Sequence, residues 1–380
     1  MVLSACVPNA STSAVGKTTT LKVDSTATDC LVSAPKAPSG TVEFDIVNST
    51  DQASEFYLLA SDGLRIVGEV ENIAPGAPRR LTVHLKPGRY FTICKPGMVG
   101  DGVGRAAFTV TDSGAKVAPV GDEKTRTAAA ANYVAFVRNQ VAGLVPATKT
   151  FLDAFVAGDA AKARALYPTT RAAYERIEPV AASFGDLDPA IDAREADVAA
   201  GETWTGFHLI EKDLWRPTDA NNGGRPYVPL TPTERQTFTD RLNRDIGRLD
   251  DAVRAENYTV SLDAISNGAI VLLDEVANRK ITGEEEIWSH TDLWDFQANL
   301  EGARAAYEAV RDIVAAKNGA LAKKIDGQFA SLEKLLAAYG SLDVGFTLYN
   351  ELSTAQVKQL ADGVNALSEP LSKLTLALVK

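Results

Sequence analysis

The chain has 380 residues, of which 45% are hydrophobic and 23% are charged, so it contains enough apolar material for folded cores. Its 39 basic and 49 acidic residues give a net charge of −10. This balance argues against nucleic acid as a partner, because nucleic acid attracts basic surfaces. The sequence has no apolar run of about 18 residues or more, the length that predicts a membrane-spanning helix.

The first residues resemble a bacterial lipobox, because small residues come directly before Cys6 in the segment 3–6. The polar residues that follow have the composition of a flexible tether. We therefore expect residues 1–16 to be the remnant of a signal peptide followed by a tether, with Cys6 lipidated at the outer side of the cell membrane. Lipidation would leave Cys30 and Cys94 as a pair in a compartment where disulfides persist.

Residues 17–111 show the pattern of a β-sandwich, in which short strands alternate with turns. Within 41–46, apolar and polar residues alternate, which places one face in a core and the other in water. The strands that we expect are rich in Val, Ile, Phe, Tyr and Thr and cover residues 17–24, 40–48, 54–59, 80–85, 89–94 and 105–110.

Residues 112–127 are expected to be a linker, and residues 128–380 have the periodicity of a helical bundle. A pentapeptide at 171–175 recurs at 304–308, which indicates either a duplicated bundle or coincidence in an alanine-rich chain. The expected helices cover residues 128–157, 159–184, 197–214, 231–255, 259–277, 292–317, 320–336 and 354–378.

Two acidic pairs in this region have helical spacing. Glu175 and Glu178 are three residues apart, so on a helix they lie on one face, and Asp188 and Asp192 are four apart. Pro179 should end or kink the first helix and leave its pair near the end. The pattern fits either a cation site or a solvated acidic face.

His208 and Glu211 form a His-x-x-Glu pair, and the sequence has only three histidines. At helical spacing, such a pair fits a metal half-site like those of carboxylate-bridged bundles. The alternative is a hydrogen-bonded histidine in a core. The nearby acidic residues favour the metal site.

The segments 174–179, 186–188, 191–195 and 206–211 resemble the EfeO-type family of extracytoplasmic iron-uptake proteins, and residues 128–380 resemble its imelysin-type, peptidase-like helical domain. This resemblance implies a multidomain β plus α fold, with a cupredoxin-like β-sandwich before the helical bundle. It also implies a binding protein that captures ferrous or ferric iron and passes it to a membrane permease, with a haem peroxidase as a further partner.

The resemblance implies a set of metal ligands in the helical domain, with Asp274 as a competitor for the last position: Glu175, Glu178, Asp192, His208, Glu211 and Glu275. Oxygen ligands with one imidazole and no thiolate suit iron, with zinc or manganese as other occupants. We expect such crowded carboxylates to be tolerable only around a bound cation. Because protons compete for the same ligands, we expect affinity to fall on acidification.

The β domain resembles cupredoxins where a strand ends at Cys94, but no histidine follows in the loop, and His84 lies on an earlier strand. A blue-copper centre is therefore not expected. Two alternatives remain open. Cys30 and Cys94 form a disulfide that closes a loop of about 65 residues, or they bind copper or iron together with Glu55, as the resemblance implies. Thr92 stands where the family usually has methionine, which weakens the copper alternative.

Two other classes of protein are less well supported. A metallopeptidase usually carries its zinc ligands and general base in His-Glu-x-x-His. That motif is absent, since His208 has no second histidine at helical spacing and His290 lies far along the chain. A polysaccharide-binding lipoprotein would present aromatic platforms, whereas three of the four tryptophans have the spacing of core residues.

Overall fold

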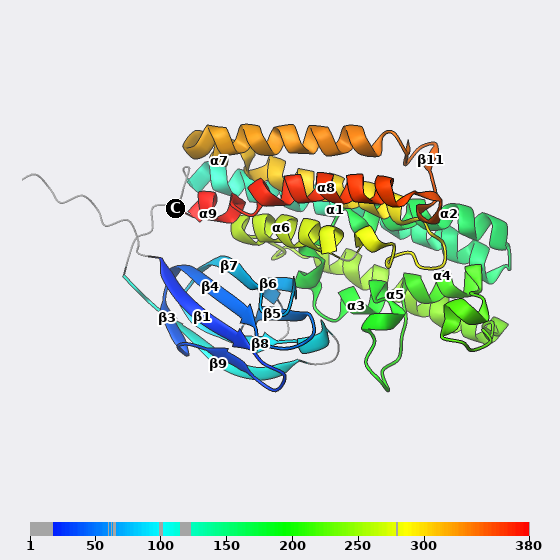
Figure 1. Cartoon of the computed structure of the whole chain (residues 1–380), viewed down its shortest axis with the longest axis horizontal. Helices are drawn as coiled ribbons and strands as arrows, with labels where there is room; N and C mark the ends of the chain where they lie inside the picture. Colours follow the sequence, from blue (N-terminus) through cyan, green and yellow to red (C-terminus); the bar gives the residue numbers. More distant parts are fainter. Residues whose placement is uncertain are drawn as a thin grey trace, which may run out of the picture.

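The protein consists of a β domain and a helical domain that lie against each other (Figure 1). The computed structural model describes residues 18–59, 61, 63, 66–98, 102–114, 123–278 and 280–379. The strands of the first part of the chain and the helices of the rest confirm the expected multidomain β plus α fold. Among the helices of these residues, none has both the length and the apolar character needed to cross a bilayer. Cys6 lies outside the described residues, so its lipidation stays a prediction.

The β domain is built from two sheets that enclose a common core. One sheet has the order β2-β1-β4-β7 and the other has the order β3-β9-β8-β5-β6. The rings of Phe44 and Phe56 lie 5.2 Å apart at the centre of this core. The bounds of the strands are β1 Thr19–Ser25, β2 Cys30–Val32, β3 Lys36–Pro38, β4 Gly40–Asn48, β5 Ser54–Leu59, β6 Ile66–Ile73, β7 Pro78–Leu85, β8 Gly88–Cys94 and β9 Val103–Thr111.

Three of these strands were not expected from the sequence. β2 and β3 have three residues each, which is too short for an alternating pattern to be recognised. β6 does alternate, but its outward positions are Glu69 and Glu71, so it resembles a polar connection. Strand β6 is important because it lies at the edge of its sheet and faces the helices.

The helical domain consists of long helices joined by short 3₁₀ turns. The bounds that matter for the site are α1 Glu123–Val156, α2 Ala160–Glu175, η2 Glu178–Phe184, α3 Leu187–Asp192, η3 Glu195–Asp197, α4 Phe207–Trp215, α5 Pro232–Arg254, α6 Leu262–Asn278, η5 Lys280–Thr282, α7 Asp292–Leu336, α8 Thr354–Leu371 and α9 Leu374–Val379. Helix α7 is interrupted at Asn318, where φ is −140° and ψ is 72°. The chain reverses there, so that Tyr307 stacks on Phe329 with 5.6 Å between ring centroids.

The helix boundaries near the acidic segments differ from those expected. Helix α1 begins at Glu123, inside the expected linker 112–127, because an acidic residue in the first turn interacts favourably with the helix dipole. The helix expected over 159–184 ends at Glu175 and continues as the 3₁₀ turn η2, which carries Pro179 near its start.

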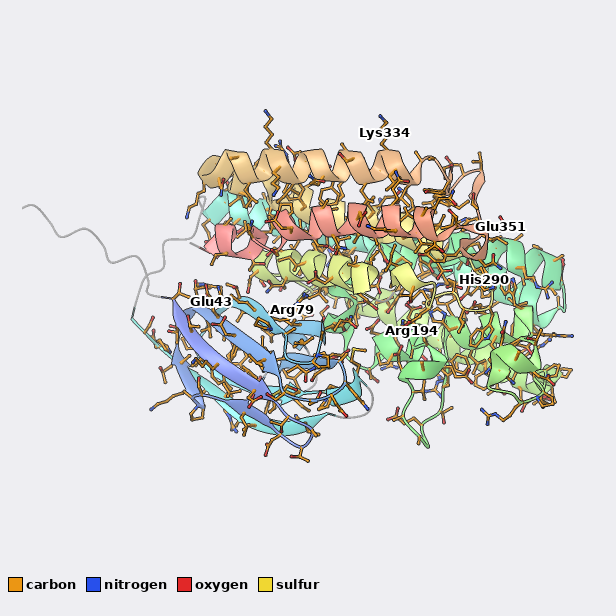
Figure 2. All side chains as sticks on the ribbon, viewed as in Figure 1. Glu43, Arg79, Arg194, His290, Lys334 and Glu351 are labelled. Carbon is orange, nitrogen blue, oxygen red and sulfur yellow. A yellow bond between two sulfur atoms is a disulfide. The ribbon has the colours of Figure 1, made fainter. Side chains whose placement is uncertain are left out.

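Helix α6 holds the two domains together (Figure 1). The Asn267 side-chain amide donates to the Thr82 carbonyl at 2.8 Å, and the backbone N–H of His84 donates to Asp263 at 3.0 Å. Arg79 and Asp274 form an ion pair across the same boundary, where Figure 2 labels Arg79. These contacts place the outer face of β5 and β6 opposite η2 and α3.

Candidate metal centre

The side chain of His208 presents an unpaired ring nitrogen to two carboxylates. It lies on α4 with 1% of its surface exposed. Nδ1 lies 3.3 Å from Oε2 of Glu211, so it carries the proton when Glu211 is ionised, because a carboxylate can only accept. Among the described residues Nε2 has no hydrogen-bond partner, and it lies 3.8 Å from Asp192 Oδ1 and 3.6 Å from Glu285 Oε1. When Nε2 carries no proton, it and the two carboxylate oxygens are directed at the same space with their lone pairs, which is the arrangement of a cation-binding site.

Two groups of metal-binding residue types therefore share His208. One is Asp192, His208 and Glu285, and the other is His208, Glu211 and Glu286, with ligand atoms within 4.8 Å of one another in each. The sequence predicted Asp192, His208 and Glu211 but not the two glutamates that precede α7. Glu285 and Glu286 belong to a run of three glutamates, which resembles a solvated surface rather than a site.

Glu175 and Glu178 are held in place by two glycines on neighbouring helices. A Cβ atom on Gly268 of α6 would lie 1.7 Å from the Pro179 carbonyl oxygen, and one on Gly302 of α7 would lie 2.4 Å from that of Arg176. Only glycine permits the backbones to approach so closely. The segment that carries both glutamates is thus packed between α6 and α7.

A buried guanidinium, which the sequence reading did not identify as part of the site, lies among these acids. Arg171 has no exposed surface and forms ion pairs with Glu175 and Asp192. Its Nε lies 2.7 Å from Glu286 and 3.5 Å from Asp295. This arginine belongs to the first copy of the repeated pentapeptide. In the second copy the equivalent residue, Arg304, lies at the surface with 42% of its side chain exposed, so the repeat does not predict the burial of Arg171.

A second internal cation, Lys280, is 4% exposed. Its ammonium lies 3.0 Å from Glu175, 2.9 Å from Glu178 and 3.5 Å from Glu285. Asn299 also donates to Glu175 at 2.8 Å. The expectation that these carboxylates need a bound cation is therefore wrong in part, because Arg171 and Lys280 already neutralise some of their charge.

The carboxyl groups of the cluster differ in the direction in which their surroundings shift the pKa. Burial raises the pKa of Asp192 to about 6 and the pKa values of Glu211 and Glu275 to about 7. For Glu175 and Glu285, burial acts in the same direction, but Lys280 lowers both pKa values together with a guanidinium group, Arg171 at Glu175 and Arg194 at Glu285. The first three carboxyls therefore exchange protons near neutral pH, where a cation would compete for them.

An acidic cavity of about 680 Å³ lies between the two domains. Asp192 and Glu285 line it, and both of these residues lie beside Nε2 of His208. Its carboxylates come from both domains and include Glu55, Glu69, Glu71, Glu178, Asp188, Asp192, Glu275 and Glu285. We call this space the interdomain chamber. A second cavity of about 410 Å³ reaches His208 from another side and is lined by Arg194, Glu285 and Trp288.

The two competitors for the late ligand position face different surroundings. Glu275 lines the interdomain chamber, whereas Asp274 pairs with Arg79 at the domain boundary. Successive residues on a helix are about 100° apart, so adjacent acids are directed to different neighbours. Of the two, Glu275 is the one near the acidic cluster.

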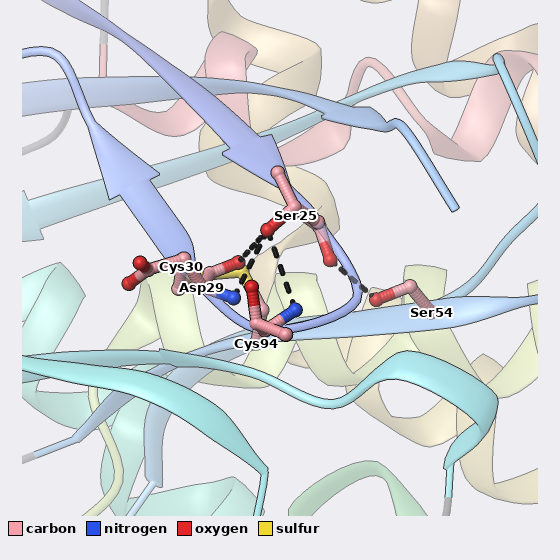
Figure 3. The surroundings of a disulfide bond; sticks show 7 residues. Ser25, Asp29, Cys30, Ser54 and Cys94 are labelled. Atoms are coloured by element: carbon pink, nitrogen blue, oxygen red, sulfur yellow. Dashed lines mark hydrogen bonds between the residues drawn. A yellow bond between two sulfur atoms is a disulfide. The ribbon is translucent and has the colours of Figure 1, made fainter.

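Cys30 and Cys94 are joined by a disulfide in the β-domain core (Figure 3). This is the first of the two alternatives expected from the sequence. Glu55 lies elsewhere, because Phe56 pairs with Cys94 in the sheet and the preceding residue faces the opposite side. Glu55 accepts a hydrogen bond from Tyr57 at 2.6 Å and lines the interdomain chamber. The expected ligand set of Cys30, Glu55 and Cys94 is therefore not brought together.

Residues 129–374 match the model of the imelysin family, Peptidase_M75. The "Iron uptake system component EfeO" of Yersinia pestis is 36% identical over 349 residues, which cover 91% of this chain and 87% of that protein. This chain belongs to the EfeO-type imelysin family. The protein of the same name from Escherichia coli O157:H7 is 36% identical over 357 residues, which cover 93% of this EfeO-type chain and 90% of that protein.

A solved structure shares the fold of part of this EfeO-type chain. It comes from Parabacteroides distasonis and is described as an iron-regulated protein A precursor. It superposes with a TM-score of 0.53 at 16% identity and covers 68% of this chain and 96% of its own.

Proposed function

We propose that this protein is the extracytoplasmic iron-binding component of a bacterial iron-uptake system. It captures ferrous or ferric iron at Asp192, His208 and Glu285. The observation that carries the proposal is the buried Nε2 of His208, which faces two carboxylates and has no hydrogen-bond partner within the part of the chain that the structure describes. The names of the curated relatives, which describe a component of iron uptake, support the choice of metal.

The residues around His208 have complementary tasks in this proposal. Glu211 orients the ring through Nδ1 and is itself fixed by the backbone N–H groups of Trp288 and Ser289, at 3.0 and 2.7 Å. Glu175, Glu178 and Glu275 supply further negative charge beside the ligands. Carboxylate oxygens and one imidazole suit iron, while zinc or manganese can occupy the same ligands.

The interdomain chamber provides the route to this site. Carboxyl groups of both domains outnumber the Lys95, Arg105 and Arg194 side chains that also line it, so the charge of the chamber favours the entry of a cation. Passage onward to a membrane permease, with a haem peroxidase in the same system, completes the proposed role. A lipid on Cys6 would keep the protein beside those partners.

We also propose that the protein binds its cargo without hydrolysing peptides. Neither candidate group in the described residues contains a second histidine. A hydrolytic zinc site usually needs both a second nitrogen ligand and a general base beside an open position. Casein hydrolysis that chelator and His208→Ala both abolish would restore the metallopeptidase alternative.

Iron loading of variants tests the proposed site. Wild type, His208→Ala and Glu285→Gln are loaded anaerobically with ferrous sulfate, or with ferric citrate, and their iron is measured after gel filtration. We expect wild type to retain iron and both variants to lose most of it. His290→Ala is the control, because His290 belongs to neither candidate group. Equal retention by wild type and His208→Ala contradicts the proposal.

A further inference from the structure

The two cations within the acidic cluster differ in how firmly they are held. Arg171 lies on the last full turns of α2, has no exposed surface, and its guanidinium contacts acids on several elements. Lys280 lies on η5, a 3₁₀ turn of three residues after α6, and offers a single ammonium. A lysine ammonium is a point charge on a flexible stem, whereas an arginine binds through a rigid planar group. Lys280 can therefore move more easily than Arg171.

Lys280 also occupies a position that a metal ion could take. Its ammonium lies between Glu175, Glu178 and Glu285, at 3.0, 2.9 and 3.5 Å. Glu178 and Glu285 line the interdomain chamber, and Glu285 also lies beside Nε2 of His208. Arg171 also pairs with Glu175, and Arg194 lies 3.4 Å from Glu285. Carboxyl groups still outnumber these three cations once Asp192, Glu211 and Glu286 beside His208 are included, so an ion of higher charge gains more at this point.

We propose that Lys280 is a displaceable counter-ion, which holds Glu175, Glu178 and Glu285 in the cation-free protein and withdraws from Glu285 when a polyvalent cation binds that residue beside His208. The inference rests on the proposed function. Because the cation must displace Lys280, affinity is lower than the carboxylates alone would give. Return of the ammonium stabilises the emptied cluster, which promotes release of the cation to the next protein.

Two substitutions of Lys280 separate this role from simple structural support. Lys280→Met removes the charge and keeps the length of the stem, and Lys280→Arg keeps the charge on a group that is harder to displace. Mn²⁺ is the first probe, because it does not change oxidation state during the titration, and free Mn²⁺ is followed by electron paramagnetic resonance. Anaerobic Fe²⁺ is the second probe.

We expect Lys280→Met to bind Mn²⁺ about tenfold more tightly than wild type and to release it more slowly to a chelator. Lys280→Arg should bind more weakly than wild type. Lys212→Met is the matched control, because Lys212 is also a buried lysine near the site but pairs with Glu195 outside the cluster, and its affinity should not change.

The outcomes distinguish this inference from the proposed function. If wild type binds through His208 while Lys280→Met binds no more tightly, the counter-ion role is wrong and the iron site stands. If His208→Ala binds as well as wild type, the site itself is wrong. Should Lys280→Met fail to fold, Lys280→Arg decides, since binding equal to wild type overturns the displacement of Lys280.

Discussion

Arg171 and Glu175 lie one helical turn apart on α2 and form an ion pair in which neither side chain is exposed. The same guanidinium pairs with Asp192, which stands beside His208. A buried charge of this kind is tolerated only while its partners remain. The pair therefore links the stability of the helical domain to the position of a candidate metal ligand.

Loss of this arginine should destabilise the protein strongly. We expect Arg171→Met to lower the free energy of unfolding by about 3–5 kcal/mol at neutral pH, because it leaves buried carboxylates without a partner. Urea unfolding measures the change. Arg304→Met is the control from the repeated pentapeptide, and its exposed ion pairs with Glu308 and Glu333 should be worth about 1 kcal/mol or less. Equal losses in the two variants would contradict the role of Arg171.

Acidification should weaken cation binding. The pKa of Asp192 is raised to about 6 and those of Glu211 and Glu275 to about 7, above the usual value of about 4 for a carboxyl group. A raised pKa in the folded state means that these groups cost stability progressively as pH rises from about 4 to about 6–7, and that a cation must displace their protons below pH 6–7.

Thermal unfolding with and without cation tests this dependence. We expect the rise in melting temperature caused by Mn²⁺ to be large at about pH 7.5 and to fall steadily by about pH 5.5. For the cation-free protein, these three groups alone predict the opposite trend, with higher stability at the lower pH. A cation-induced rise that stays constant over this range would show that protons do not compete for the ligands.

Neutralising Glu275 and neutralising Asp274, which are adjacent on α6, should have different effects on cation affinity. Glu275→Gln removes a carboxylate of the interdomain chamber and should lower cation affinity about tenfold, with little effect on domain contacts. Asp274→Asn breaks the ion pair with Arg79, so it should loosen the domain boundary and leave affinity nearly unchanged. Isothermal titration measures affinity, and hydrogen exchange in α6 and β7 measures the boundary. Similar effects of the two variants on affinity would contradict this division.

The disulfide should contribute to stability and not to metal binding at His208. It joins cysteines that are 64 residues apart, so its removal by Cys30→Ala with Cys94→Ala should cost about 4 kcal/mol of unfolding free energy. Reductant should have the same effect on wild type and none on the double variant. The mass of the unreduced protein should be lower by two hydrogens, and iron retention should be unchanged.

Much of the fold was predictable from local patterns. Alternation over 41–46 and the strand-forming residues of 54–59 and 89–94 predicted β4, β5 and β8, because these periods report which face is buried. The separation of helices at 292–317 and 320–336 was also correct, since Asn318 and Gly319 interrupt a helical pattern. By contrast, the sequence of β6 resembles a polar loop, because the glutamates at its outward positions make the segment acidic.

The sequence by itself determined the order of the two domains, the cysteine pair and the helical spacing of His208 and Glu211, because each depends on residues close in the chain or few in number. Only the tertiary structure decided what faces Nε2 of His208. Glu285 comes from a distant segment, and Arg171 and Lys280 enter the cluster from two other elements. No local period reports such contacts, since long-range packing sets the charge around a buried group.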